Sequence, residues 1–142
     1  MTRNPGDTPT AVVIDPGLLA HEILTPEDRG VCTAWRNGLV IPAFSKFTLD
    51  HALKLLCDMG LRLDAIEIWA LWMTRRDRTI FVPAAASGST LLQEYEHTIL
   101  QAHAAGMVTD RPADLAGKLS PGIPVLTPDD LTRILAKTQG LF

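Results

Sequence analysis

The stretch "AVVIDPGLLA" (residues 11–20) decides the fold. It opens with an unbroken, mostly β-branched apolar run and then delivers one carboxylate, Asp15, directly into a Pro-Gly turn. An apolar run of this length is typical of a strand buried on both faces, as in a parallel sheet. Parallel strands need crossover connections, which are usually helical. The rest of the chain should therefore alternate helices with strands.

The remaining sequence follows this alternation. Four further segments are expected to be strands: 39–44, 79–83, 106–110 and 122–127. Six segments are expected to be helices: 25–38, 45–60, 63–77, 90–106, 111–119 and 128–138. The first of these helices should begin at Thr25, with Pro26 at its first position, and end at Gly38, while Thr127 should cap the last. The pattern predicts an α/β fold with a mostly parallel sheet covered by helices on both faces.

Length and composition limit the function classes. The 142 residues, 46% of them hydrophobic, are enough for one domain, expected over residues 11–142 after a flexible tail at 1–10. The net charge of −3 excludes a protein that coats nucleic acid by bulk positive charge. Cys32 and Cys57 have no metal-ligand spacing, which favours reduced thiols in a cytoplasmic protein. No signal peptide or membrane span is expected.

Carboxylates gather at one predicted edge of the sheet. The segments "AVVID" and "GMVTD" both end in an acid, Asp15 and Asp110. The helix at 90–106 adds Glu96, and the helix at 45–60 adds Asp50. Parallel sheets bind ligands at the carboxyl ends of their strands, and clustered carboxylates favour Mg²⁺ or Mn²⁺. Such a site activates water for attack on phosphodiesters.

Three stretches of the chain resemble the PIN-domain family. They are "AVVIDPGLLAHEIL", "IPAFSKFTLDHALKLL" and "EYEHTILQAHAAGMVTDRPADLAGKLSPGIPVLTPDDLTRIL". Many members of this family are metal-dependent ribonucleases, including the toxins of bacterial toxin–antitoxin pairs. The resemblance implies a three-layer α/β/α fold, a small acidic pocket and hydrolysis of RNA with a divalent metal. It also implies RNA as a partner, and an antitoxin protein and a homodimer as further candidates.

The resemblance assigns the catalytic and metal-binding roles to Asp15, Glu96 and Asp110. Asp15 stands where the family has Asp-Thr-Asn, but Pro16 and Gly17 follow it here. The additional candidates are Asp50, His51 and Asp114, since each lies at or beside a position that matches a family acid. His51 falls on the family's glutamate and Asp50 one residue before it, about 100° around the helix. Either Asp110 or Asp114 matches the fourth acid, and strand position favours Asp110.

Each of these residues also has a purely structural interpretation. Asp15 is typical of a helix N-cap, and Glu96 and Glu94 of acids in the first turn of a helix. The three arginines of "RRDR", Arg75, Arg76 and Arg78, are candidates to contact the RNA backbone, but cations are also expected near a helix C-terminus.

The aromatic and histidine residues are weaker indicators. Trp35, Trp69 and Trp72 occupy apolar helical positions that favour a core or an interface over base stacking. His97 and His103 are six residues apart and fall on different helix faces, which excludes a zinc pair.

Two functions remain as hypotheses. In the first, the protein is a Mg²⁺- or Mn²⁺-dependent ribonuclease, with the metal held by its carboxylates. In the second, the acidic site has degenerated and the protein is a PIN-fold module for nucleic-acid binding or regulation. The residues that follow Asp15, together with the missing glutamate, distinguish the two, since lost supporting contacts weaken a metal site. A nucleotide enzyme is disfavoured because no glycine-rich loop follows a strand.

Overall fold

A computed structural model describes residues 9–25, 30–85 and 89–138 of the chain. Its strands and helices are, in order, β1 (Thr10–Ile14), α1 (Pro16–Leu24), α2 (Val31–Arg36), β2 (Val40–Phe44), α3 (Lys46–Asp58), α4 (Leu63–Met73), β3 (Ile80–Phe81), α5 (Leu91–Ala102), β4 (Met107–Val108), α6 (Pro112–Ala116), β5 (Val125–Leu126) and α7 (Pro128–Thr138). Most of the expected tail, residues 1–8, lies outside the described residues.

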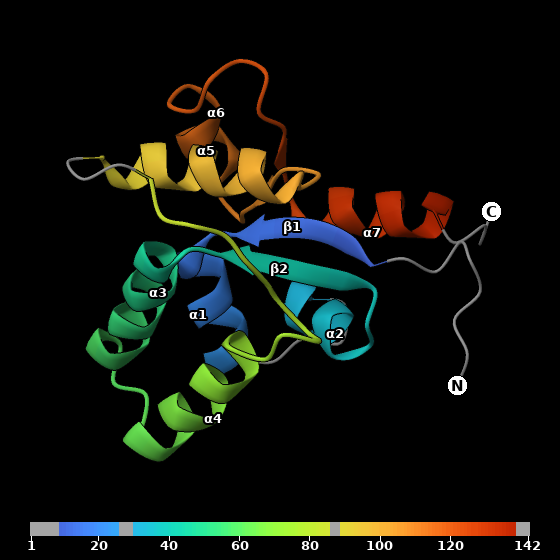
Figure 1. The fold of residues 1–142 in the computed structure, drawn as a ribbon. Helices are drawn as coiled ribbons and strands as arrows, with labels where there is room; N and C mark the ends of the chain where they lie inside the picture. Colours follow the sequence, from blue (N-terminus) through green and yellow to red (C-terminus); the bar gives the residue numbers. More distant parts are fainter. Residues whose placement is uncertain (1–8, 26–29, 86–88, 139–142) are drawn as a thin grey trace.

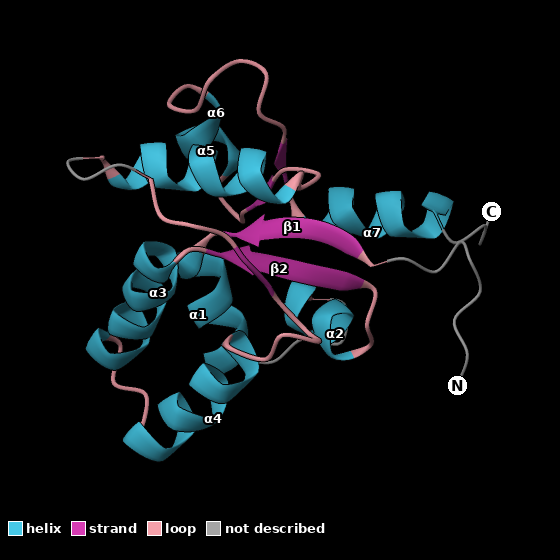
Figure 2. Ribbon diagram, in the orientation of Figure 1, coloured by secondary structure: helices cyan, strands magenta, loops and turns pink. Residues whose placement is uncertain are grey.

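The centre of the molecule is a five-stranded parallel sheet. Its order is β3-β2-β1-β4-β5, so β1 occupies the middle position and pairs with both β2 and β4. Helices α1 to α4 lie on one side of the sheet, and α5 and α6 on the other (Figures 1 and 2). The predicted α/β class and parallel sheet are confirmed, and the arrangement is a three-layer α/β/α sandwich.

Alternate residues of β1 enter two hydrophobic cores. Val12 and Ile14 belong to the core shared with α1 to α4 and α7, whereas Val13 packs with Tyr95 and Ile99 of α5. Successive side chains of a strand point to opposite faces, so a strand in the middle of a covered sheet must be apolar on both. This requirement explains the unbroken apolar run of the opening stretch.

The first helices differ from the sequence prediction. A helix begins directly after β1, at Pro16, and Thr25 is its C-cap, donating its backbone N–H to the His21 carbonyl. The prediction that Thr25 starts a helix was therefore wrong. Asp15 caps the new helix and Pro16 takes its first position, where a missing N–H costs nothing. Residues 26–29 of the expected helix lie outside the described residues, and its remainder is α2.

A buried glutamate starts α2. The Glu22 carboxylate on α1 accepts from the backbone N–H groups of Val31 at 3.1 Å and Cys32 at 2.9 Å. Glu22 thus does the work of an N-cap from another helix, because Gly30 at that position has no side chain. A Cβ at Gly30 would collide with this carboxylate.

The last helix begins as predicted. The Asp130 backbone N–H donates to Thr127 Oγ1 at 3.1 Å, and the Thr127 N–H donates to the Asp130 carboxylate at 3.0 Å. This reciprocal pair is a capping box closed by aspartate. Of the helices in the described ranges, none combines the length and apolar composition that a membrane crossing requires.

Candidate functional site

Asp15 lies at the carboxyl edge of the sheet, directly after β1. Its backbone N–H donates to the Val108 carbonyl at 2.9 Å, which continues the pairing of β1 with β4. Its Oδ1 accepts from the Gly17 N–H at 3.2 Å, and its Oδ2 accepts from Thr109 Oγ1 at 2.7 Å. The interpretation of Asp15 as an N-cap is confirmed. Asp15 is half-buried at the carboxyl end of β1, and the bond from Thr109 joins it to the residue that follows β4.

A pocket of about 200 Å³ opens beside Asp15. Its wall is mostly apolar, and the lining residues are Asp15, Pro16, Gly17, His51, Leu55, Leu91, Leu92, Tyr95, Met107 and Leu115. Asp15 and His51 are its acid and its imidazole, one from the end of β1 and the other from α3. The pocket therefore combines a carboxylate that accepts hydrogen bonds and an imidazole with walls that suit a flat or aliphatic group.

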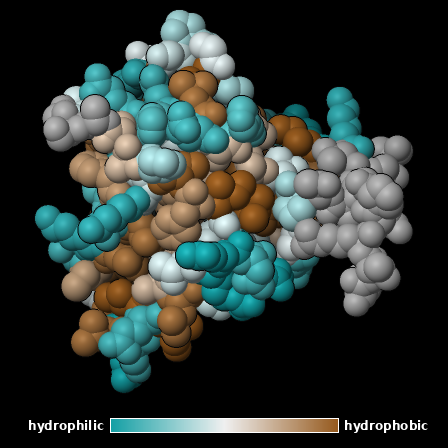
Figure 3. All heavy atoms as spheres, viewed as in Figure 1, coloured by the Kyte–Doolittle hydropathy of each residue, from teal (hydrophilic) through white to brown (hydrophobic). Residues whose placement is uncertain are grey.

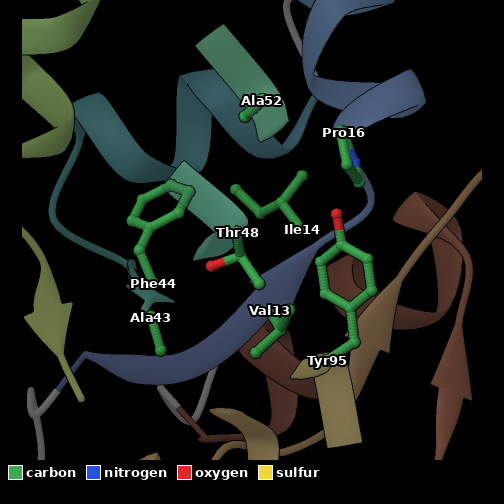
Figure 4. Close-up of a pocket in the computed structure, with 8 residues that line it drawn as sticks. All are labelled: Val13, Ile14, Pro16, Ala43, Phe44, Thr48, Ala52 and Tyr95. Atoms are coloured by element: carbon green, nitrogen blue, oxygen red, sulfur yellow. The ribbon is translucent and has the colours of Figure 1, made fainter. Parts of the chain in front are cut away.

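Tyr95 stands behind this pocket with a buried hydroxyl. The side chain rises from α5 and its oxygen points toward Pro16 (Figure 4). Among the described residues the hydroxyl has no hydrogen-bond partner. Tyr95 also lines a second, tightly packed hollow next to the pocket beside Asp15, and Figure 4 shows this second hollow. Burial, and secondarily the nearby charge of Asp15, raise the pKa of Tyr95. The phenol is therefore a neutral group at the rear of the pocket at physiological pH.

The structure settles which residue of α3 faces Asp15. His51 lines the pocket, whereas Asp50 is exposed on the surface. One residue turns a helix by about 100°, so the two side chains cannot share a direction.

The other predicted acids do not converge on Asp15. Glu96 accepts from the Ser120 backbone N–H at 2.6 Å and from its hydroxyl at 2.9 Å, which ties α5 to the loop after α6. Asp110 and Asp114 are exposed and are not among the residues that line the pocket. Within the part of the chain that the structure describes, no group of three or more His, Cys, Asp or Glu side chains is placed to hold a metal ion.

Glu94 is an acid whose burial the sequence analysis missed. It is only 2% exposed, and its carboxylate accepts from the Ser45 hydroxyl and the Ala85 backbone N–H, each at 3.0 Å. The signal lies one turn further along α5, because Thr98 shares the helix face of Glu94 and is fully buried, whereas Glu96 is half-buried. Glu94 joins α5 to the N-cap of α3 and to the segment after β3.

The arginine and tryptophan residues form a cluster on the side of the sheet that carries α2 and α4. Trp35 is buried and donates its indole N–H to the Arg78 carbonyl at 2.9 Å, which confirms its core role. The guanidinium groups of Arg75 and Arg78 lie 5.4 and 5.8 Å from the centre of the Trp72 ring. Arg76 borders an open hollow of about 460 Å³ with Thr74, Thr79 and Phe81.

Comparisons of the chain with protein-family models, with curated proteins and with solved structures found no match. The pocket around Asp15 and His51 is therefore the feature of the molecule that bears on function.

Proposed function

We propose that this protein is a PIN-like binding module that holds single-stranded RNA at the pocket around Asp15 and His51. The observation that carries the proposal is the sharing of one small, largely apolar pocket by a carboxylate and an imidazole, at the carboxyl end of a parallel sheet. Ligands of open α/β sheets bind at this end of the strands. RNA itself comes from the resemblance to the PIN family.

The size and chemistry of the pocket favour one unstacked base. A volume of about 200 Å³ is below the ~300 Å³ at which pockets for drug-sized ligands begin. Leu55, Leu92 and Met107 offer surfaces against which a base can pack. The Asp15 carboxylate accepts two hydrogen bonds and keeps lone pairs for the N–H groups of a base edge. A carboxylate favours bases with amino groups, as it does with cytosine.

The charge of the protein sets the expected strength of binding. With a net charge of −3, attraction to phosphates is limited to local arginines such as Arg76. We expect weak affinity for RNA and a shallow dependence on salt, because few counterions are released.

A second candidate function is the metal-dependent ribonuclease. The observation that favours it is again Asp15 with His51, because carboxylate and imidazole are both metal ligands, and Mg²⁺ is often held by one or two carboxylates together with substrate phosphates. Bound there, the ion would activate water and offset phosphate charge. Glu96 and Asp110 are not among the residues that line the pocket. Asp15 and His51 therefore offer fewer metal ligands than the group of carboxylates expected from the sequence. A toxin role with an antitoxin partner rests on this second candidate.

One experiment separates the two functions. Short labelled single-stranded RNAs are titrated with protein in EDTA and again in Mn²⁺, and the same samples are run on a gel for cleavage. The variants are Asp15→Asn, which keeps an N-cap residue, and Asp50→Asn as the matched control on the exposed neighbour of His51.

If RNA binds in EDTA, Asp15→Asn should weaken the binding ~tenfold, and Asp50→Asn should leave it unchanged. This result supports the binding module. Cleavage that needs Mn²⁺ and disappears in Asp15→Asn supports the ribonuclease. Neither binding nor cleavage by the wild-type protein would overturn both proposals.

A further inference from the structure

Tyr95 carries a buried hydroxyl whose hydrogen has no acceptor within the described part of the chain. The residue is only 3% exposed. Its oxygen points toward Pro16, whose ring offers neither a donor nor an acceptor (Figure 4). A buried hydroxyl without a partner costs free energy, and phenylalanine would fill the same space without that cost. The hydroxyl therefore indicates a partner that comes from outside the chain.

The Tyr95 side chain belongs to the same site as Asp15. Tyr95 and Pro16 both line the pocket of about 200 Å³ beside Asp15, and both also line the tight hollow next to it. Burial and, second, the charge of Asp15 raise the pKa of Tyr95, so the phenol stays protonated and can donate. The site thus combines an unused donor from α5 with an acceptor at the end of β1.

We propose that this pocket selects cytosine, with the Tyr95 hydroxyl donating to ring nitrogen N3 and the Asp15 carboxylate accepting from the amino group of the base. The inference rests on the proposed binding of single-stranded RNA and names the base that enters the pocket. Cytosine carries its amino group directly beside an acceptor nitrogen, so one edge of the base matches both protein groups. Acceptance of a hydrogen bond from this amino group is a known use of carboxylates in base recognition.

Both protein groups are able to make these bonds. The Asp15 carboxylate accepts from the Gly17 N–H and the Thr109 hydroxyl, and it keeps further lone pairs for a ligand. The Tyr95 oxygen is buried before a ligand binds, so the side chain has to shift slightly as the base enters. Side-chain changes of this kind are common on binding. His51 can donate or accept, so it adds a contact without deciding the base.

The other bases fit this pair less well. Uracil offers one N–H, which lies between two carbonyl groups, so a carboxylate that accepts from it meets a carbonyl oxygen on either side. The amino group of cytosine has a carbon-bound hydrogen on one side and the acceptor nitrogen on the other. Adenine and guanine also offer a donor beside an acceptor, but each has two rings, and the pocket is small. Electrostatics thus favour cytosine over uracil, and size favours it over the purines.

Fluorescence anisotropy with labelled oligocytidine, oligouridine and oligoadenosine of equal length measures the preference. The titrations are run in EDTA, which separates binding from metal-dependent cleavage. The wild-type protein should bind oligocytidine ~tenfold more tightly than the other two. Tyr95→Phe keeps the ring and removes the hydroxyl, so it should lose most of this preference. Asp50→Asn, the exposed control on α3, should keep the preference of the wild type.

A second control addresses bases that stack elsewhere on the surface. Hydrophobic residues gather over α3 and α4 at the lower left of the molecule (Figure 3), and Leu71 on α4 is 68% exposed. Leu71→Ser reduces this apolar surface, and α4 contributes no residue to the pocket beside Asp15. This variant should keep the preference for oligocytidine. Loss of the preference in Leu71→Ser would place base selection outside the pocket and would overturn the proposal.

Thermal unfolding distinguishes base selection from a structural role of the hydroxyl. Tyr95→Phe should unfold at the same temperature as the wild type or above it, because no described residue binds the hydroxyl in the RNA-free protein. A clear drop in the melting temperature would reveal a structural partner and would overturn the proposal.

The binding results separate this inference from the proposed function. Equal binding of the three oligonucleotides, or tighter binding of oligoadenosine, would retain the RNA-binding module and overturn the selection of cytosine. An unchanged preference in Tyr95→Phe would also overturn it. Binding of none of the oligonucleotides by the wild-type protein would overturn the inference together with the binding module.

Discussion

Thr109 donates a 2.7 Å hydrogen bond from its hydroxyl to Asp15 across 94 residues of sequence. Thr109 is fully buried and follows β4, while Asp15 ends β1 and caps α1. The same Thr109 oxygen accepts from the Arg111 N–H at 3.1 Å, so it also orders the turn into α6. One hydroxyl thus fixes the orientation of the pocket carboxylate and the relation between two strands.

Removal of that hydroxyl should destabilise the protein. Hydrogen bonds to charged groups contribute ~1.5–3 kcal/mol, so Thr109→Val should lower the free energy of unfolding by about that amount. Urea unfolding followed by tryptophan fluorescence measures the change. Thr109→Ser keeps the oxygen and loses a methyl group, and should be less destabilised than Thr109→Val. No loss in Thr109→Val, or a loss smaller than that of Thr109→Ser, would show that the methyl group, and not the hydrogen bond, matters.

Glu94 should be more important for stability than its exposed neighbours. Glu94→Ala leaves the Ser45 hydroxyl and the Ala85 N–H without their acceptor in a buried place, at a cost of ~2–4 kcal/mol. Glu94→Gln keeps one acceptor oxygen and should cost less. The control is Glu67→Ala on the exposed face of α4. Chemical denaturation of the three variants measures their free energies of unfolding. An equal loss of stability in Glu67→Ala and Glu94→Ala would contradict the prediction.

The two cysteines should differ in reactivity. Burial, the Glu22 charge and a hydrogen bond with Glu22 raise the pKa of Cys32 to about 12. Its thiol is thus protonated and enclosed at neutral pH, whereas Cys57 is exposed. A thiol reagent should modify one cysteine in the native protein and both in denaturant, as counted by mass spectrometry. Cys57→Ser should leave a native protein that does not react, and rapid labelling of that variant would refute the assignment.

Acid should weaken the start of α7. The N–H and hydroxyl of Thr127 hold the pKa of Asp130 below its ordinary value. A carboxyl with a lowered pKa in the folded state stabilises the fold above its unfolded pKa of ~3.9 and loses that contribution as the pH falls through the folded value. Below pH ~4, the melting temperature of Asp130→Asn should therefore fall less than that of the wild type. Thermal unfolding across that range tests it, with Asp129→Asn as the adjacent exposed control.

The order of elements along the chain was predictable because each segment carries a local signal. The apolar run of β1, the Thr127 cap and the amphipathic spacing of α3 and α5 act within a few residues, and the structure confirms them. The first helix was misplaced because Asp-Pro-Gly also suits a turn, and only the packing of α1 against α2 and α3 distinguishes the two. Local sequence signals do not decide between a turn and a helix when tertiary packing supplies most of the stability of the helix.

The amino-acid sequence by itself determined an α/β chain whose central strand ends on a carboxylate. The tertiary structure alone decided what that carboxylate meets. In the fold, His51 lines the same pocket as Asp15, and Glu96 accepts hydrogen bonds from Ser120. Buried Glu94 accepts a hydrogen bond from Ser45 at the start of α3. Whether two side chains share a pocket depends on helix rotation and strand order, since a turn of about 100° per residue moves a side chain from one neighbour to another. The residue types at the sheet edge could be read from the chain, whereas their convergence required the fold.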